Sequence, residues 1–376
     1  MNQTINTTLR VFIPFALGYF LSYLYRVVNV VMAPDLVRDL DIGPSALGLL
    51  TASYFISFAS VQLPLGVLLD RFGPRKVEAF LLIFAGLGAF VFARSGTLAG
   101  LVMGRALIGF GVAACLMAAF KAYVLWFPKR QWPLANGFQM AAGGMGAIAA
   151  TTPVEAALQI TDWRGVFAIL ALLTLLVAVI IFLVVPEKPL DEKGESFGDQ
   201  MRGVRQVFSS LEFWRTAPLT TMSQASFLSI QGLWAGPWLK DVAGMDRTAV
   251  ARSLLWIAVA MVAGFISLGT LAERLARFGI SSLTTAVIGV SFFMVIQVAI
   301  ILGLGDSPML LWICFGFFGT SNIITYASLS QSFPAHLSGR VTTGVNLLVF
   351  IAAFIGQWAI GAIIGLWPIG EDGSYA

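Results

Sequence analysis

Arg26 stands inside a long apolar run, residues 11–33, where a full charge needs a physical reason to be present. Ser22, Tyr25 and Asn29 lie at spacings that place them on the same helical face as Arg26. A polar face on an apolar helix borders a cavity or a partner helix. A guanidinium can donate paired hydrogen bonds to a carboxylate, so this face predicts an anion-binding site. The alternative is a structural arginine bonded to neighbouring carbonyl groups.

Two further ionisable residues lie inside apolar runs. Lys121 is about six residues from the end of the run 97–127, which places it roughly 9 Å deep in a helix. It could bind the substrate or a proton, or it could extend its stem so that the ammonium reaches the interface. Glu155 lies near the end of the run 134–158 and offers the protonatable carboxylate that proton coupling needs. The alternative is an interfacial side chain in water.

Neutral polar and aromatic residues in other runs could bond to a substrate or join helices to each other. The run 214–238 is interrupted near its end by Gly232, Gly236 and Pro237. Such interruptions are tolerated where helices line a cavity and are typical of discontinuous gating helices. The side chains that we expect to line a substrate cavity are Gln139, Gln231, Trp234 and Tyr326.

The composition places all of these residues in a membrane. Of the 376 residues, 58% are hydrophobic and 11% are charged, and the mean hydropathy is +0.86. A soluble domain is roughly 45–50% apolar and about 25% charged. The net charge of +4 is scattered over loops, so it does not indicate nucleic-acid binding. The sequence offers no metal cluster, cofactor motif, P-loop or catalytic triad, and we do not expect an enzyme.

The apolar runs predict the number of membrane spans. A spanning helix needs about 20 apolar residues, and eleven runs come close to this length. The expected spans are 11–33, 46–69, 77–93, 97–127, 134–158, 165–185, 214–238, 250–271, 280–303, 309–331 and 341–366.

The positions of the loop cations predict the orientation of these spans. Thirteen lysines and arginines lie on one side and five on the other, which places the N-terminus in the cytoplasm. An odd number of spans then places the C-terminus in the periplasm. The longest loop, 187–211, is a cytoplasmic linker between a six-helix bundle, 1–186, and a five-helix bundle, 212–376.

The loop between the second and third expected spans carries a dense motif, GVLLDRFGPRK at 66–76. Gly66 and Gly73 allow two helix ends to approach and turn sharply. Asp70 begins a loop that cannot lie in lipid, and Arg71 and Arg75 add cations on one side. The motif resembles the loop between helices 2 and 3 of the major facilitator superfamily, G-x-L-x-D-R-x-G-x-R-K, at every fixed position.

An internal repeat supports this resemblance. The segment GTLAER at 269–274 copies GVLLDR at 66–71, with Glu273 in place of Asp70 and Arg274 in place of Arg71, at an offset of 203 residues. A Phe-Pro pair recurs at 127–128 and 333–334. The resemblance implies an all-α membrane protein of two pseudo-repeated bundles, with the substrate held between them near the midplane.

Two further segments resemble parts of the superfamily. Tyr25 and Arg26 with Asn29 are similar to helix 1 of the organic-anion and organophosphate branches, where an arginine binds the substrate's negative charge. The second arginine of those branches has no counterpart near residues 229–231, so one cation suits a monocarboxylate or a zwitterion better than a phosphate. Arg105, with the glycines around it, resembles the helix 4 motif R-x-x-x-G-x-G, which implies a structural or proton-coupling role.

The resemblance implies a function as well as a fold. We expect a secondary active transporter of the inner membrane that moves a small organic anion by alternating access, as a proton symporter. Asp70 would pair across helix ends as a latch, and Arg71 and Arg75 would hold the cytoplasmic gate. We expect a monomer in the bilayer whose partners are the substrate and protons. The alternatives are a proton-driven efflux antiporter and a truncated, non-transporting member, because the family usually has twelve helices.

Overall fold

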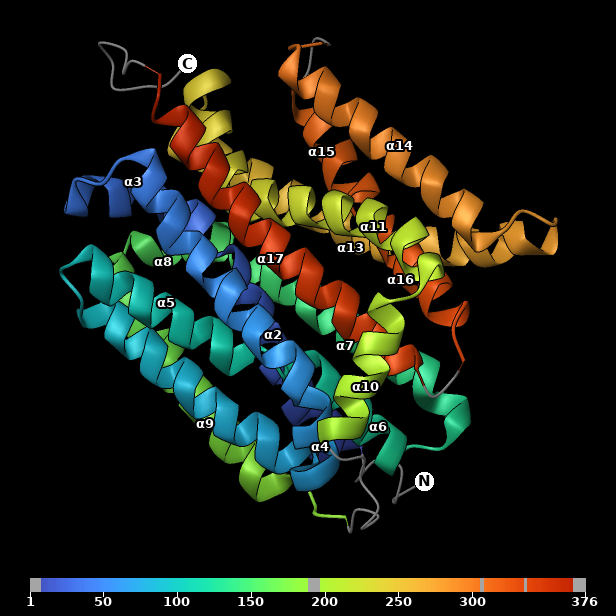
Figure 1. Cartoon of the computed structure of the whole chain (residues 1–376). Helices are drawn as coiled ribbons and strands as arrows, with labels where there is room; N and C mark the ends of the chain where they lie inside the picture. Colours follow the sequence, from blue (N-terminus) through green and yellow to red (C-terminus); the bar gives the residue numbers. More distant parts are fainter. Residues whose placement is uncertain (1–7, 189–196, 305–307, 335–336, 368–376) are drawn as a thin grey trace.

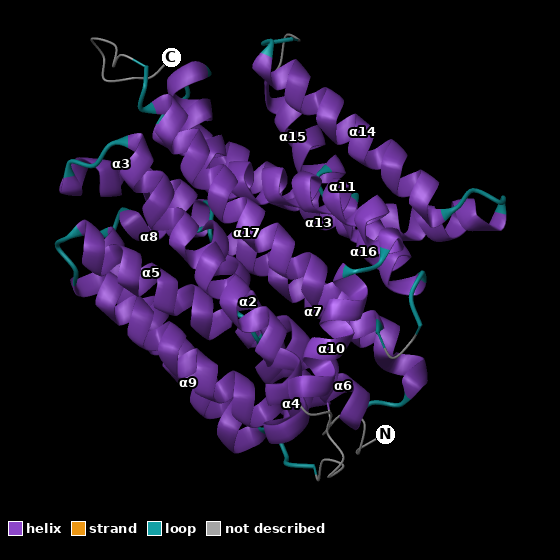
Figure 2. Ribbon diagram, in the orientation of Figure 1, coloured by secondary structure: helices purple, strands orange, loops and turns teal. Residues whose placement is uncertain are grey.

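The computed structural model describes residues 8–188, 197–304, 308–334 and 337–367, and these residues fold as packed helices (Figure 1). Helices joined by short loops make up the described part of the chain, and no strand occurs in it (Figure 2). The all-α prediction is therefore confirmed. Residues 189–196 of the expected linker lie outside the described residues.

The helices before the linker form the lower left of Figure 1. They are α2 (Ile13–Val27), α3 (Asn29–Leu40), α4 (Pro44–Arg94), α5 (Leu98–Val112), α6 (Cys115–Trp126), α7 (Trp132–Ala149), α8 (Thr152–Leu158) and α9 (Trp163–Val184). A π-helical turn, η1 (Thr8–Phe12), precedes α2, and a 3-10 turn, η2 (Lys129–Gln131), precedes α7. Helix α4 packs against α5 and α9, and α2 packs against α7.

Most of the helices after residues 189–196 lie in the upper right of Figure 1, whereas the first of them lies below the centre and the last runs from the upper left towards the lower right. These helices are α10 (Phe197–Phe208), α11 (Leu211–Ser229), α12 (Ala235–Pro237), α13 (Arg247–Arg277), α14 (Ser282–Ile301), α15 (Pro308–Phe318), α16 (Asn322–Gln331) and α17 (Ser338–Ile364). The interrupted run 214–238 contains a π-helical turn, η3 (Ile230–Trp234), and a second, η4 (Trp238–Val242), follows Pro237. Helix α17 packs along α4 and joins the two groups of helices.

The helix lengths bear on the expected spans. Seven described helices, or eight with the bent pair of α2 and α3, are long and apolar enough to cross a membrane. Helix α4 contains the two expected spans 46–69 and 77–93 and changes direction at Gly73, where φ is 80°. The expected spans 134–158 and 214–238 are each divided among shorter helices. The count of eleven spans therefore stays a prediction.

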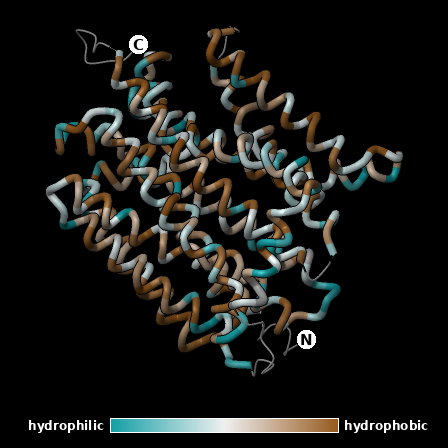
Figure 3. Tube along the Cα trace, in the orientation of Figure 1, coloured by the Kyte–Doolittle hydropathy of each residue, from teal (hydrophilic) through white to brown (hydrophobic). Residues whose placement is uncertain are grey.

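Exposed apolar side chains cover the outside of the helix bundle. On α9, Leu172 and Leu183 are 69% and 70% exposed, and on α14 Val295 is 64% exposed. Hydrophobic residues continue along the length of both helices (Figure 3). A face of this kind is compatible with lipid and not with water. Together with the long apolar helices, it supports a multi-pass membrane protein.

Close helix contacts depend on glycine at several crossings. A Cβ on Gly88 of α4 would lie 2.7 Å from the carbonyl oxygen of Gly104 in α5. At Gly18 of α2 the close neighbour is a side chain. A Cβ there would overlap a carboxyl oxygen of Glu78, a fully buried residue of α4. Gly18 thus provides the space that the Glu78 side chain occupies between α2 and α4.

This packing predicts the effect of adding one methyl group at Gly18. Gly18→Ala should lower the stability of the purified protein by about 1–3 kcal/mol, since an overpacked core has to shift. Gly18→Ala combined with Glu78→Ala should recover most of the loss, because the clashing carboxyl is gone. Thermal unfolding in detergent measures both. Gly137→Ala is the matched control, as nothing lies within 4 Å of a Cβ there. Equal destabilisation by the single and double variants would contradict this account.

Candidate functional site

Arg26 lies at the end of α2, where helices from both groups meet. It is 7% exposed. Its guanidinium carbon is 4.4 Å from the ring centroid of Tyr23, 5.6 Å from that of Phe58 in α4 and 5.4 Å from that of Phe350 in α17. The rings of Phe58 and Phe350 are themselves 4.2 Å apart. The cation is therefore enclosed by aromatic faces, which stabilise it in a site with little water.

Polar groups around Arg26 come from both groups of helices. Asn29 is fully buried, and its amide donates a hydrogen bond of 3.3 Å to the Thr51 hydroxyl. Tyr326, in α16, donates a hydrogen bond of 2.9 Å to Asn346 in α17, the helix whose Phe350 ring faces Arg26. The structure thus brings together Arg26, Asn29 and Tyr326, three of the residues that the sequence analysis assigned to substrate binding.

Two other predicted residues, Tyr25 and Gln139, lie elsewhere. The Tyr25 hydroxyl is 2.9 Å from that of Thr174 in α9, on a different side of α2 from Arg26. Consecutive residues of a helix point about 100° apart. The prediction that Tyr25 shares a face of the helix with Arg26 is therefore wrong. Gln139 is fully buried, accepts a hydrogen bond from Tyr123 and donates one to the Phe15 carbonyl. Both side chains join helices of the first group.

The interrupted segment between α11 and α13 carries Gln231 and Trp234. The Gln231 amide lies 3.4 Å from the Met261 sulfur, and the Trp234 indole donates a hydrogen bond of 2.9 Å to the Gln357 carbonyl. Trp234 also lines a cavity of about 760 Å³ that extends between α3, α13 and α17. Of these two predicted residues, Trp234 is the one that borders this cavity.

Lys121 is held by the motif at 66–76. Its ammonium lies 2.7 Å from a carboxylate oxygen of Asp70, and the side chains are 35% and 31% exposed. The expected latch carboxylate therefore pairs with α6, a helix of its own group. Lys121 thus pairs with the motif and is not among the side chains that surround Arg26.

The cations of the same motif contact the first group and the start of the linker. Arg71 lies over the ring of Phe72, while Arg75 is 3.8 Å from the Glu187 carboxylate. Lys76 also pairs with Glu187. The hydrogen bond from Lys76 holds the pKa of the Glu187 carboxyl below its ordinary value, with Arg75 adding a smaller effect. Among the described residues, the ion-pair and ring contacts of Arg71 and Arg75 are therefore with α4, α9 and Glu187, and not with a helix of the second group.

The repeated motif at 269–274 has a different local structure from the first copy. Gly66 and Gly73 lie in α4, which bends at Gly73, whereas α13 continues as a helix through Glu273 and Arg274 to Arg277. Glu273 accepts a hydrogen bond of 2.9 Å from Arg277, four residues along, with both side chains exposed. The repeat in sequence therefore does not place Glu273 against a lysine of a second helix.

Arg105 is buried in α5 at 1% exposure. Its guanidinium carbon lies 5.0 Å from the ring centroid of Tyr54 in α4. The Tyr54 hydroxyl donates a hydrogen bond of 3.3 Å to the Ser22 carbonyl of α2. Tyr54 therefore joins Arg105 to α2, the helix that carries Arg26.

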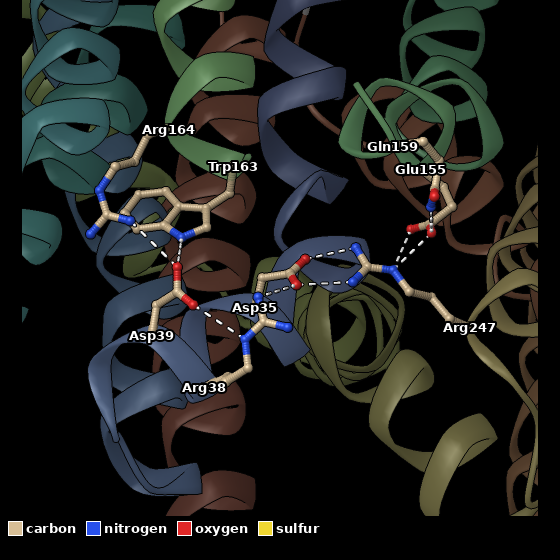
Figure 4. A network of polar contacts seen from close by, with 8 residues as sticks. All are labelled: Asp35, Arg38, Asp39, Glu155, Gln159, Trp163, Arg164 and Arg247. Atoms are coloured by element: carbon tan, nitrogen blue, oxygen red, sulfur yellow. Dashed lines mark hydrogen bonds and ion pairs between the residues drawn. The ribbon is translucent and has the colours of Figure 1, made fainter. Parts of the chain in front are cut away.

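Glu155 belongs to a network that the sequence did not predict (Figure 4). Arg247, the first residue of α13, donates through Nε to both Glu155 oxygens at 2.7 and 2.9 Å. Its two terminal nitrogens donate to the Asp35 oxygens at 2.9 and 2.7 Å. The Glu155 and Asp35 side chains are only 8% and 10% exposed. Glu155 is thus neither free in water nor isolated in lipid.

Sequence reasoning missed three ionisable residues that the structure singles out, namely Asp35, Arg247 and Glu78. In the sequence, Arg247 is one of the five loop cations on the side predicted to face the periplasm. Asp35 follows Pro34 just beyond the first apolar run, and Glu78 lies inside the expected span 77–93. A search for every carboxylate within a few residues of an apolar run would have found both acids, but not the pairing with Arg247.

The comparisons with known proteins now identify the family. The model of the Major Facilitator Superfamily matches residues 15–357, most of the chain. The protein belongs to the Major Facilitator Superfamily. This family consists of membrane transporters rather than enzymes, and the prediction from the motif at 66–76 is confirmed.

Curated superfamily members share about a quarter of the aligned residues with this chain. The probable sulfoacetate transporter SauU of Cupriavidus necator is 25% identical over 293 residues, which cover 74% of this chain and 67% of that protein. The hexuronate transporter of Escherichia coli strain K12 is 28% identical over 177 residues, covering 47% and 41% of the two chains. The chain thus spans two thirds or less of the length of these relatives.

Solved structures of facilitators share the fold. An inward-facing, occupied bacterial homologue of the human lysosomal transporter Spinster superimposes with a TM-score of 0.77 at 19% identity, over 95% of this chain and 82% of that one. A D-xylose-proton symporter gives 0.70 at 16% identity, over 94% and 89%. At these identities the similarity establishes the fold alone.

The Asp70–Lys121 pair generates a prediction about the facilitator motif. Asp70→Asn removes the charge and keeps the shape, so the 66–76 segment should loosen from α6. A partly exposed pair contributes at most about 1 kcal/mol, which corresponds to roughly fivefold faster hydrogen exchange in this segment. Glu273→Gln, at the repeated position, should leave its own segment unchanged within about 0.5 kcal/mol. Unaltered exchange at 66–76 in Asp70→Asn would show that the pair does not hold the loop.

Proposed function

We propose that this protein is a secondary active transporter that moves a small organic anion by alternating access, with Arg26 as the anion-binding residue and protons as the coupling ions. The observation that carries the proposal is the enclosure of Arg26. Its guanidinium is surrounded by Tyr23, Phe58 and Phe350 and has no carboxylate partner among the described residues. A buried cation of this kind is stabilised further by a bound anion.

The position of Arg26 supports a transport role over a purely structural one. Phe58 belongs to the group of helices before the linker and Phe350 to the group after it, so an anion on Arg26 would touch both. In alternating access the two groups rock around a central site. We propose that the division at residues 187–211 separates these moving parts, with the N-terminus in the cytoplasm and the inner membrane as the location.

The charge at the site supports a monoanion. Lys121 is paired with Asp70, so Arg26 supplies the positive charge by itself, and Asn29 and Tyr326 offer neutral hydrogen bonds. Those groups would suit the hydroxyls of a sugar acid. The names of the two relatives reported above, a sulfoacetate and a hexuronate transporter, also refer to carboxylates.

Ligand-dependent thermal stabilisation tests the proposal. Galacturonate should raise the melting temperature of the purified protein, whereas galactose, which lacks the carboxylate, should not, because only a ligand that binds the folded state stabilises it. Sulfoacetate extends the test to a dianion. Stabilisation by galactose and galacturonate alike would contradict an anion site.

Substitutions of Arg26 separate binding from folding. Arg26→Lys keeps the charge but loses the paired donors, so affinity for the stabilising anion should fall by about 1–3 kcal/mol. Arg26→Ala should abolish the anion-dependent shift while the melting temperature without ligand stays close to that of the unaltered protein. Lys121→Gln is the control and should retain binding. A large loss of stability in Arg26→Ala with affinity intact would instead make Arg26 structural.

A further inference from the structure

The Arg247 network joins the two groups of helices at one end of the molecule. Asp35 lies in α3 and Glu155 in α8, both before the linker, whereas Arg247 begins α13, after the linker. Helices α3 and α8 lie towards the end of the bundle opposite to α6 (Figure 1), and the three side chains meet beside them (Figure 4). The loop-cation pattern predicts that this end faces the periplasm.

The geometry of the network makes Arg247 a shared partner. All three nitrogens of its guanidinium donate hydrogen bonds to two carboxylates, and both carboxylates are about nine-tenths buried. Charge-assisted pairs with this geometry are strong, and a buried carboxylate deprived of its partner is costly. Any movement that carries α13 away from α3 and α8 has to break both pairs at once.

Other polar and charged groups surround the network, and two of them also contact its carboxylates. Arg38 is 3.3 Å from Asp35 and from Asp39, and Asp39 also accepts hydrogen bonds from Trp163 and Arg164. Gln159 donates to Glu155. The cavity beside the network is also bordered by Lys240, Asp241 and Asp246. The Asp39 cluster lies wholly within the first group of helices, so it can persist when the groups separate.

We propose that Asp35, Glu155 and Arg247 form a lock that keeps the two groups of helices closed at the predicted periplasmic end, and that protons from that side release it by binding the two carboxylates. This proposal rests on one part of the proposed function, the alternating access of the two groups of helices, and does not depend on anion binding at Arg26. A proton and the guanidinium compete for the same oxygens, because a protonated carboxyl loses its charge and part of its acceptor capacity.

The competition gives the lock a direction. When Arg247 is bound, its nitrogens occupy the carboxylate oxygens of Asp35 and Glu155, so a proton has to displace them. When it leaves, these oxygens are no longer bonded to the guanidinium, and the described contacts that remain are those of Arg38 with Asp35 and of Gln159 with Glu155. A higher proton concentration on the predicted periplasmic side therefore favours the open state, which is the state in which a proton symporter loads.

Distances between spin labels across this end test the lock directly. Labels at Ile160→Cys and Val242→Cys, both exposed, report the separation of the two groups in a Cys115→Ala and Cys314→Ala background. We expect one short distance at pH 7.5 and a second, longer distance that grows several-fold in population at pH 5.5. The protein is reconstituted in nanodiscs without any substrate.

Three variants make the test specific. The double variant Asp35→Asn with Glu155→Gln should show the longer distance at both pH values. Arg247→Gln breaks the same pairs from the other side and should give the same result, so it serves as a second test where the double variant folds poorly. Asp39→Asn removes a carboxylate that stays within one group, so it should respond to pH as the unaltered protein does.

Two results would overturn the proposal. If both lock variants keep the short distance at both pH values, the network does not hold the groups together. If they open but the unaltered protein ignores pH, protons do not release the lock. Because the measurement needs no ligand, either result leaves anion binding at Arg26 untouched, and a failure of anion binding would not change these distances.

Discussion

Charges inside a bilayer need compensation, and in this protein the means of compensation differs from one charge to the next. Arg26 is enclosed by aromatic rings, Arg247 is bonded to two carboxylates, and Lys121 pairs with Asp70. A guanidinium stays ionised in practice, so each arrangement must be kept or replaced as the helices move. A charge with an incomplete set of partners suits ligand binding, whereas a fully paired one suits a contact that opens and closes.

The two regions share one continuous segment of chain. Arg26 ends α2 and Asp35 lies in α3, and these helices form a pair bent by 46°. Nine residues of helix rise at most about 13.5 Å, so Asp35 and Arg26 lie close together along this segment. The proposed anion site and the proposed lock therefore share one structural element. This arrangement fits a transport cycle in which occupancy and gating depend on each other.

Close helix packing keeps this geometry defined. Gly88 and Gly104 allow the backbones of α4 and α5 to approach, and Gly18 leaves space for Glu78 beside α2. Membrane helices associate by such van der Waals contacts, because lipid offers no hydrophobic drive between them. The aromatic enclosure of Arg26 depends on α4 and α17 lying side by side, so packing between the two groups of helices sets the shape of the proposed anion site.

The sequence by itself determined the class, the family and the presence of a charged position in the first span. Apolar runs and the motif at 66–76 are local patterns, and periodicity within one helix suffices to single out Arg26 and Asn29. The tertiary structure decided which residues meet. The pairing of Arg247 with Asp35 joins positions 212 residues apart, and the separation of Tyr25 from Arg26 depends on which neighbour each side of α2 faces. Local spacing does not contain such contacts, because they arise from the packing of one helix against another.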